Sequence, residues 1–307
     1  YVYPQTAPSS VPVAAELAWW RDGAESYLSV PGTVRLDPST PHTLAQQRRD
    51  LRLSFNVRLP ESALAKGPLG IRVSRLRLVG GDDFELDGSI ESSVSFSPAP
   101  PLRIRAVGMR YRSGALLVSP EARHFDYLRS YLLRTYPTAE LVWSQIVVDA
   151  DFQAPLGDRT ALLSNAQLSA MRSREVSQGI DARTHYVALV DDDNGRNFMR
   201  GRASDIPGMP APDTVCSSPV GRPGGLAGDT DESYADWYGA HELAHTFGRY
   251  HPGFPVGEQD ASDASFPYED GKITNPDDLC IGLDHGDQSL MLPQRVLDGE
   301  THHDLMT

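Results

Sequence analysis

Apolar and polar side chains alternate along residues 51–59, where leucine, phenylalanine or valine occupies every second position. A period of two places the apolar side chains on one face of a β-strand. Shorter runs of this kind occupy residues 71–78, 84–86 and 94–96. The first of these changes phase near Ser74-Arg75, which predicts a β-bulge there.

Short strands with turn residues between them predict a small β-sandwich over residues 51–100. Residues 1–50 are rich in proline, serine and alanine and show little periodicity. We therefore expect an extended lead-in, parts of which can belong to the sandwich.

Beyond residue 101 the pattern alternates between strands and helices. Strands are predicted at residues 102–106, 141–148 and 185–190, and helices at 120–136 and 161–178. The dense apolar run at 141–148 is typical of a central strand. This succession predicts an α/β or α+β domain over residues 101–307, in which helices back a mixed twisted sheet.

The charge is uneven along the 307 residues, which carry a formal net charge of −13. Residues 1–150 hold 17 basic and 15 acidic side chains, and residues 151–307 hold 11 and 26. The net charge argues against nucleic acid as the main partner, and the acidic half predicts a preference for basic substrates. No run of about 18 apolar residues occurs, so no membrane-spanning helix is predicted.

Two cysteines, Cys216 and Cys280, are too few for a disulfide scaffold. They allow one bridge in an oxidising compartment, and two buried thiols are the alternative. The chain begins without an initiator methionine, so we expect that the native N-terminus was removed.

The segment His241-Glu242-Leu243-Ala244-His245 places two histidines at i and i+4. On a helix both imidazoles project from one face and can bind one metal ion, and Glu242 can address a water on that ion. Ten residues of continuous helix would carry His251 about 15 Å from His241. We therefore predict that the helix ends at Gly248, because glycine accepts the left-handed conformation that turns the chain back.

The segment from His241 to His251 resembles the H-E-x-x-H-x-x-G-x-x-H signature of metzincin zinc endopeptidases, and its spacing is most similar to reprolysin-like and serralysin-like bacterial members. The resemblance implies a metzincin-like catalytic domain, one zinc ion held by His241, His245 and His251, and a methionine turn beneath the metal. Met306 lies in a segment similar to that turn, and Met291 is a weaker candidate. Because relatives continue beyond this turn, we expect further native chain after Thr307.

These residues predict a zinc-dependent endopeptidase, secreted or at the cell surface, whose substrates are proteins or peptides. Glu242 would act as general base and then general acid toward a zinc-activated water. The resemblance also implies that an extended substrate pairs with an edge strand near residues 199–204. The alternatives are a catalytically silent binding or adhesion module braced by zinc, and a hydrolase acting on non-protein amides. The oligomeric state is not predicted.

The run Asp191-Asp192-Asp193-Asn194-Gly195 has carboxylates spaced as in part of a calcium loop. Asn-Gly between two strand patterns favours a hairpin turn instead, and no glutamate follows at the required offset. Four other histidines, His185, His285, His302 and His303, are interpreted first as packing or solvent residues.

Overall fold

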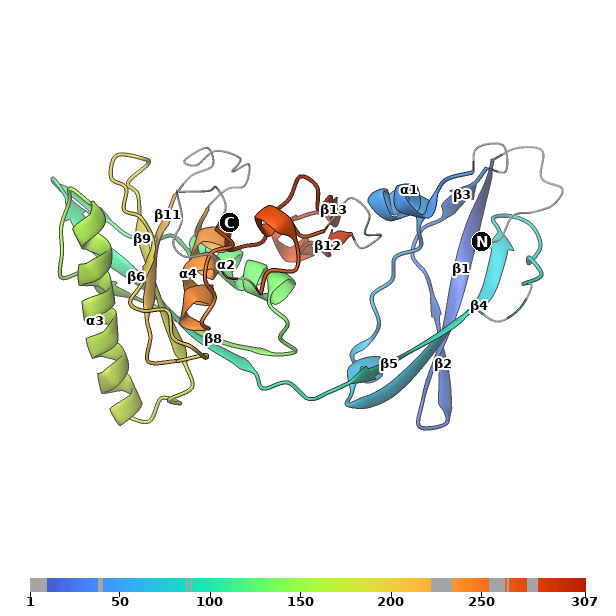
Figure 1. Cartoon of the computed structure of the whole chain (residues 1–307), viewed down its shortest axis with the longest axis horizontal. Coiled ribbons are helices and arrows are strands. Elements are labelled where there is room, and N and C mark those ends of the chain that lie inside the picture. Colours follow the sequence, from blue (N-terminus) through green and yellow to red (C-terminus); the bar gives the residue numbers. More distant parts are fainter. Residues whose placement is uncertain are drawn as a thin grey trace. The chain divides into compact units, whose positions relative to one another are not determined.

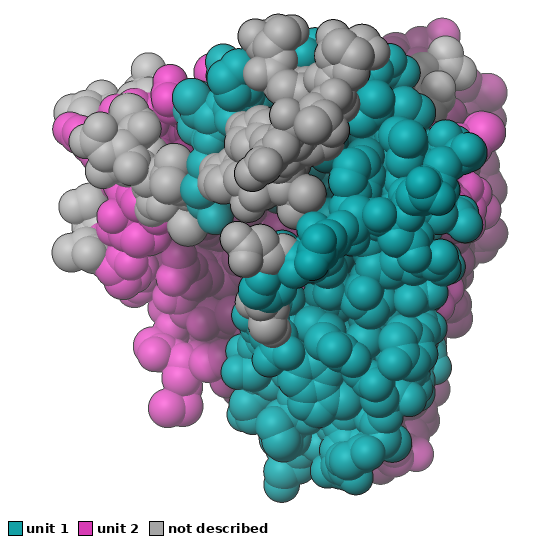
Figure 2. All heavy atoms as spheres, turned by 90° about the vertical axis from the view of Figure 1, so that its right-hand side faces the viewer, with its two compact units in different colours: residues 1–99, 276–283, 295–298 teal, residues 100–275, 284–294, 299–307 magenta. Residues whose placement is uncertain are grey.

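The computed structural model describes residues 10–37, 41–86, 88, 90–221, 234–253, 263, 265–274 and 281–307. The chain divides into two compact units, drawn as ribbons in Figure 1 and coloured separately in Figure 2. Unit 1 comprises residues 1–99, 276–283 and 295–298, and unit 2 comprises the rest. In the described part of the chain, no helix is long and apolar enough to span a bilayer.

Unit 1 is built on one antiparallel five-stranded sheet. Its strands are β1 (Val11–Arg21), β2 (Ala24–Ser29), β3 (Val34–Leu36), β4 (Gly67–Leu78) and β5 (Glu91–Phe96). They run in the order β2-β1-β4-β5, and β3 also pairs with β1. Three short helices separate β3 from β4 in the chain: α1 (Leu44–Arg49), η1 (Leu51–Leu53) and η2 (Glu61–Leu64). The sequence predicted two stacked sheets, whereas these five strands form one.

The first 50 residues are not the irregular lead-in that the sequence predicted, because β1 to β3 lie within them. The strand β4, which pairs with β1, contains a bulge. Glu16 pairs with Arg75 and Leu17 pairs with Val73, so Ser74 is the extra residue on β4. The bulge predicted near Ser74-Arg75 is therefore confirmed, and the buried positions of β1 change phase opposite it, from Val13 and Ala15 to Ala18.

The strand predicted over residues 51–59 is wrong, although Phe55 and Val57 pack against the core of unit 1. Side chains supply the hydrogen bonds that a ladder would have supplied. The Asp50 carboxylate accepts from the backbone N–H of Arg52 at 2.9 Å, and the Asn56 amide donates to the carbonyl of Ser54 at 3.1 Å. Such local hydrogen bonds compete with those of a sheet. The alternating apolar and polar residues of 51–59 therefore do not form a strand.

Unit 2 contains a six-stranded sheet in the order β10-β11-β9-β6-β7, with β8 also paired to β6. Its strands are β6 (Leu102–Ser113), β7 (Leu116–Val118), β8 (Leu141–Asp149), β9 (His185–Asp191), β10 (Arg202–Ala203) and β11 (Cys216–Val220). Strands β8, β6, β9 and β11 are parallel, whereas β7 and β10 pair antiparallel with their neighbours.

Helices cover both faces of this sheet: α3 (Asp158–Ser177) on one side, and α2 (Ala122–Thr135) and α4 (Ala235–Thr246) on the other (Figure 1). Strand β9 is buried on both faces, because Val187 and Leu189 pack in the core with α2 and α4 while Tyr186 and Ala188 pack in the core with α3. A parallel strand that is buried on both faces has a nearly continuous run of apolar residues, and residues 185–190 show such a run.

Two predictions about this sheet are wrong. Strand β8 lies at an edge rather than at the centre, since it pairs only with β6 and leaves Val142, Ile146 and Val147 exposed. An apolar run alone does not distinguish these positions. Strands β9 and β10 do not form a hairpin, because β11 lies between them and Asp192 N–H donates to the Val220 carbonyl at 2.9 Å.

The remaining elements are short and belong to the C-terminal third of the chain. They are η3 (Glu269–Gly271), β12 (Gly282–Asp284), η4 (Gln288–Leu290) and β13 (Arg295–Leu297), and β12 pairs with β13.

Helix α2 offers a matched test of the core that supports α4. Leu128 is 0% exposed in the core shared with α4, whereas Leu133 on the same helix is 43% exposed. We expect Leu128→Ala to lower the free energy of unfolding by about 2–5 kcal/mol, because it leaves a cavity, and Leu133→Ala to lower it by less than about 1 kcal/mol. Urea unfolding measures both, and equal losses would contradict the packing described here.

Candidate metal centre

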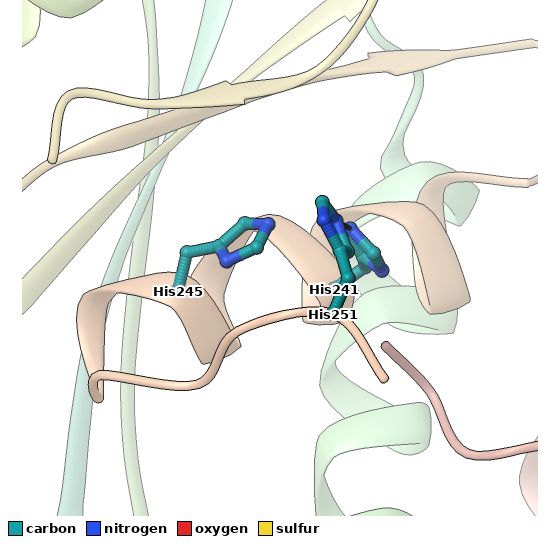
Figure 3. A group of neighbouring side chains, drawn as sticks. All are labelled: His241, His245 and His251. Carbon is teal, nitrogen blue, oxygen red and sulfur yellow. Dashed lines mark hydrogen bonds between the residues drawn. The ribbon is translucent and has the colours of Figure 1, made fainter. Parts of the chain in front are cut away.

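Three imidazoles converge beside α4 (Figure 3). His241 and His245 lie on α4, and His251 lies on the segment that follows it. The Nε2 atoms of His241 and His251 are 3.1 Å apart, and one nitrogen from each of the three rings lies within 4.8 Å of the others. Ligands about 2.05 Å from a tetrahedral zinc are about 3.3 Å apart, so this spacing fits a shared ion. It is the one cluster of at least three His, Cys, Asp or Glu ligands among the residues that the structure describes.

The predicted end of the helix at Gly248 is confirmed. Gly248 has φ +87°, its N–H donates to the His245 carbonyl at 2.9 Å, and Arg249 N–H donates to the Ala244 carbonyl at 3.2 Å. These two bonds form the Schellman motif that closes a helix with a left-handed residue. A Cβ on Gly248 would lie 2.5 Å from the Pro207 carbonyl oxygen. Only glycine fits this turn, which brings His251 back to the helix.

Backbone carbonyls fix the tautomers of the two helical histidines. His241 Nδ1 lies 2.8 Å from the Leu305 carbonyl, and His245 Nδ1 lies 2.7 Å from the Arg249 carbonyl. A carbonyl only accepts, so each Nδ1 carries the proton and each Nε2 keeps its lone pair for a metal. Burial lowers the pKa of His241 to about 4, so its ring is neutral at pH 7.

The turn that contains Met306 sets the position of the Leu305 carbonyl. The Asp304 carboxylate accepts from Met306 N–H at 3.0 Å, and the Asp304 carbonyl accepts from Thr307 N–H at 3.0 Å. Met306 is 1% exposed, whereas Met291, the weaker candidate for this turn, is 90% exposed. The turn at Met306 therefore lies next to His241 through the Leu305 carbonyl, which favours Met306 over Met291 as the candidate.

Glu242 lies beneath the segment that leads into β10. A Cβ on Gly201 would come within 2.4 Å of Glu242 Oε1 and 2.3 Å of Tyr238 Cε1, so the absence of a side chain there lets the backbone rest on both. Burial raises the pKa of Glu242 to about 8, while a backbone hydrogen bond from Ala203 and the charge of Arg202 act in the opposite direction. The carboxylate faces the cleft that contains the histidines.

This cleft has a volume of about 890 Å³ and runs between residues 200–206 and α4. The segment on its far side from α4 includes β10, which is an edge strand of the sheet. The predicted edge strand near residues 199–204 is thereby confirmed. Gly201, Tyr238 and the carbonyls of Arg249 and Leu305 were not predicted to belong to the site. A glycine within a strand pattern signals close backbone approach, but backbone carbonyls leave no signal in a sequence.

The other candidate residues lie apart from the three-histidine cluster. His303 Nδ1 lies 3.0 Å from the Asp270 carbonyl, His302 Nδ1 lies 3.1 Å from Thr301 Oγ1, and His285 Nδ1 lies 2.9 Å from the Gly286 carbonyl. Cys216 is a fully buried free thiol in β11, which matches the plain-thiol alternative, and Cys280 lies outside the described residues.

The Asp191–Gly195 run forms a turn, with φ +52° at Asp193, +59° at Asn194 and +78° at Gly195. Protein donors already engage its carboxylates: Asp192 accepts from the Tyr234 hydroxyl at 2.7 Å, and Asp193 accepts from the Ser113 hydroxyl at 2.8 Å. The run is therefore a turn held by side-chain hydrogen bonds, although not the hairpin turn that the sequence favoured.

Comparison of the chain with protein-family models, with curated proteins and with solved structures gives no match.

Gly248→Ala tests the turn that completes the cluster. The substitution places a Cβ at φ +87° and against the Pro207 carbonyl, so we expect His251 to be displaced and zinc affinity to fall about 10- to 100-fold. Gly208→Ala is the control, because a Cβ there meets nothing within 4 Å. Competition with a fluorescent chelator measures both, and equal affinities for the two variants would contradict this role of the turn.

His185 supports the end of α4 and gives stability a pH dependence. Its Nδ1 lies 3.0 Å from Thr246 Oγ1, whose proton goes to the Leu243 carbonyl, and burial lowers the pKa of His185 from 6.5 to about 4. The unfolded chain therefore binds a proton first, and stability is lost as the pH falls from about 6.5 through about 4.

We expect His185→Gln, which does not titrate in this range, to lose less stability on acidification than the original protein. The difference approaches about 3 kcal/mol at low pH, and comparing the two proteins cancels the titration of all other groups. Urea unfolding between pH 4 and pH 7 measures it. Parallel curves would contradict the burial of a neutral His185.

Proposed function

We propose that the chain is a zinc-dependent endopeptidase that hydrolyses peptide bonds in the cleft beside α4. The observation that carries the proposal is the convergence of three histidine nitrogens and the Glu242 carboxylate at one open cleft. Two of these histidines are held in the tautomer that leaves Nε2 free, which fits a bound zinc ion.

Each group in the cleft has a chemical task. A zinc ion held by the three histidines supplies a Lewis acid that polarises a carbonyl and lowers the pKa of water. The charge of a zinc ion on the histidines would favour the ionised form of Glu242, which takes the proton of the attacking water and returns it to the leaving amine. The backbone of Gly201 holds this carboxylate in place, and the outer edge of β10, which no other described strand pairs with, is available to an extended substrate.

The arrangement favours an enzyme over a binding module that zinc merely braces. Structural zinc sites close the coordination sphere with a fourth protein ligand. Within the described ranges the cluster has three candidate ligands, and a cleft opens onto them. An extended edge strand also favours a peptide over a small non-protein amide. The proposal includes secretion or attachment at the cell surface, as the resemblance of the motif implies.

Glu242→Gln separates catalysis from metal binding. We expect it to lower kcat on a quenched-fluorescence peptide library by about 10²- to 10⁴-fold while zinc content, measured by atomic emission, stays at one ion per chain. Glu140→Gln, outside the cleft, is the matched control. Undiminished cleavage by Glu242→Gln would exclude the proposed proton transfers. Stoichiometric zinc without cleavage of any peptide by the unmodified protein would favour the binding module.

A further inference from the structure

The charge lining the cleft differs from the charge of the surrounding sequence. Arg200 and Arg202 line it, and neither forms an ion pair with any residue that the structure describes. The acidic residues of the lining are Asp205 and the buried Glu242.

Side chains alternate between two faces along residues 200–204, which we call the edge segment. Arg200 and Arg202 therefore do not share a face with Gly201. Gly201 rests on Tyr238 and Glu242, and Ala203 packs against the core shared with α2 and α4. Because successive side chains of an extended segment point to opposite faces, Arg200, Arg202 and Ser204 share the other face, and all three are exposed. A substrate strand paired with this edge presents every second side chain to that face.

Distance decides which charges matter to a bound peptide. At physiological ionic strength the Debye length is about 8 Å, so acidic groups spread over the rest of the domain are largely screened. Two guanidinium groups on the edge segment lie within cross-strand reach of the substrate, where an opposite charge is favourable and a like charge is unfavourable. The local arrangement therefore opposes the preference for basic substrates that the net charge predicted.

We infer that Arg200 and Arg202 select peptides with acidic side chains at alternate positions around the scissile bond. The inference rests on the proposed function, since it places the substrate along β10. Carboxylates of aspartate or glutamate two residues apart would face the two guanidinium groups, and lysine at the same positions would be rejected.

The test compares peptides that share one sequence and differ only in Glu, Gln or Lys at each position near the cleaved bond. We expect kcat/KM to follow Glu, then Gln, then Lys, with about a two- to fivefold step for each charged pair and a smaller ratio at high salt. Arg200→Gln combined with Arg202→Gln should bring the ratio of Glu to Lys peptides toward one, and Arg202→Glu should invert it. Both peptides are cleaved by the same variant, so any effect of the substitution on Glu242 changes both kcat/KM values and leaves their ratio unchanged.

Arg159→Gln is the matched control, because this exposed arginine on α3 lies outside the cleft, and we expect it to keep the ratio. Fluorescence anisotropy of the same peptides on Glu242→Gln gives the order of binding without turnover. Cleavage of all three peptides at equal rates, or faster cleavage of the Lys peptide, overturns the inference and leaves the endopeptidase intact. If no peptide is cleaved, the proposed function fails, and the order of binding still decides the charge preference.

Discussion

The reversal of the chain at Gly248 is the constraint on which the three-histidine cluster depends. A helix alone presents two of the three histidines, and the third reaches them only because the helix closes within the seven residues from Ala244 to Tyr250. The turn serves two purposes at once. It returns His251 to the helix, and it places the Arg249 carbonyl where it holds the Nδ1 proton of His245. A change in the turn therefore disturbs two ligands through one backbone movement.

The second support of the centre comes from segments that lie far away in the chain. Leu305 follows His241 by 64 residues, and Gly201 precedes Glu242 by 41, yet each contacts that residue through its backbone. Such contacts require the whole of unit 2 to be folded. The sheet supplies the edge on which Gly201 lies, and the cores on its two faces fix α4 relative to that edge. The position of the Glu242 carboxylate therefore depends on how the core places α4 against the edge strand β10.

The sequence predicted the clustering of His241, His245 and His251 and the end of the helix at Gly248, because these depend on spacing within one short segment. It predicted the strands of unit 2 where continuous apolar runs occur. It was wrong where long-range pairing decided the outcome: β8 became an edge strand, and β11 separated β9 from β10. Strand β1 was missed because its buried positions, Val13, Ala15 and Ala18, do not share one phase and include two small residues. Alternation over residues 51–59 was misleading because Asp50 and Asn56 bond to the local backbone.

The 64-residue separation between His241 and the carbonyl that orients it also has a consequence for the order of events during synthesis. The ribosome releases the helix with its two histidines and the turn with the third well before it releases Leu305. Until then no carbonyl holds the proton of His241 at Nδ1, although all three histidines of the cluster have been synthesised. A nascent chain in which the five- and six-stranded sheets are already translated would therefore still lack the carbonyl that holds the Nδ1 proton of His241.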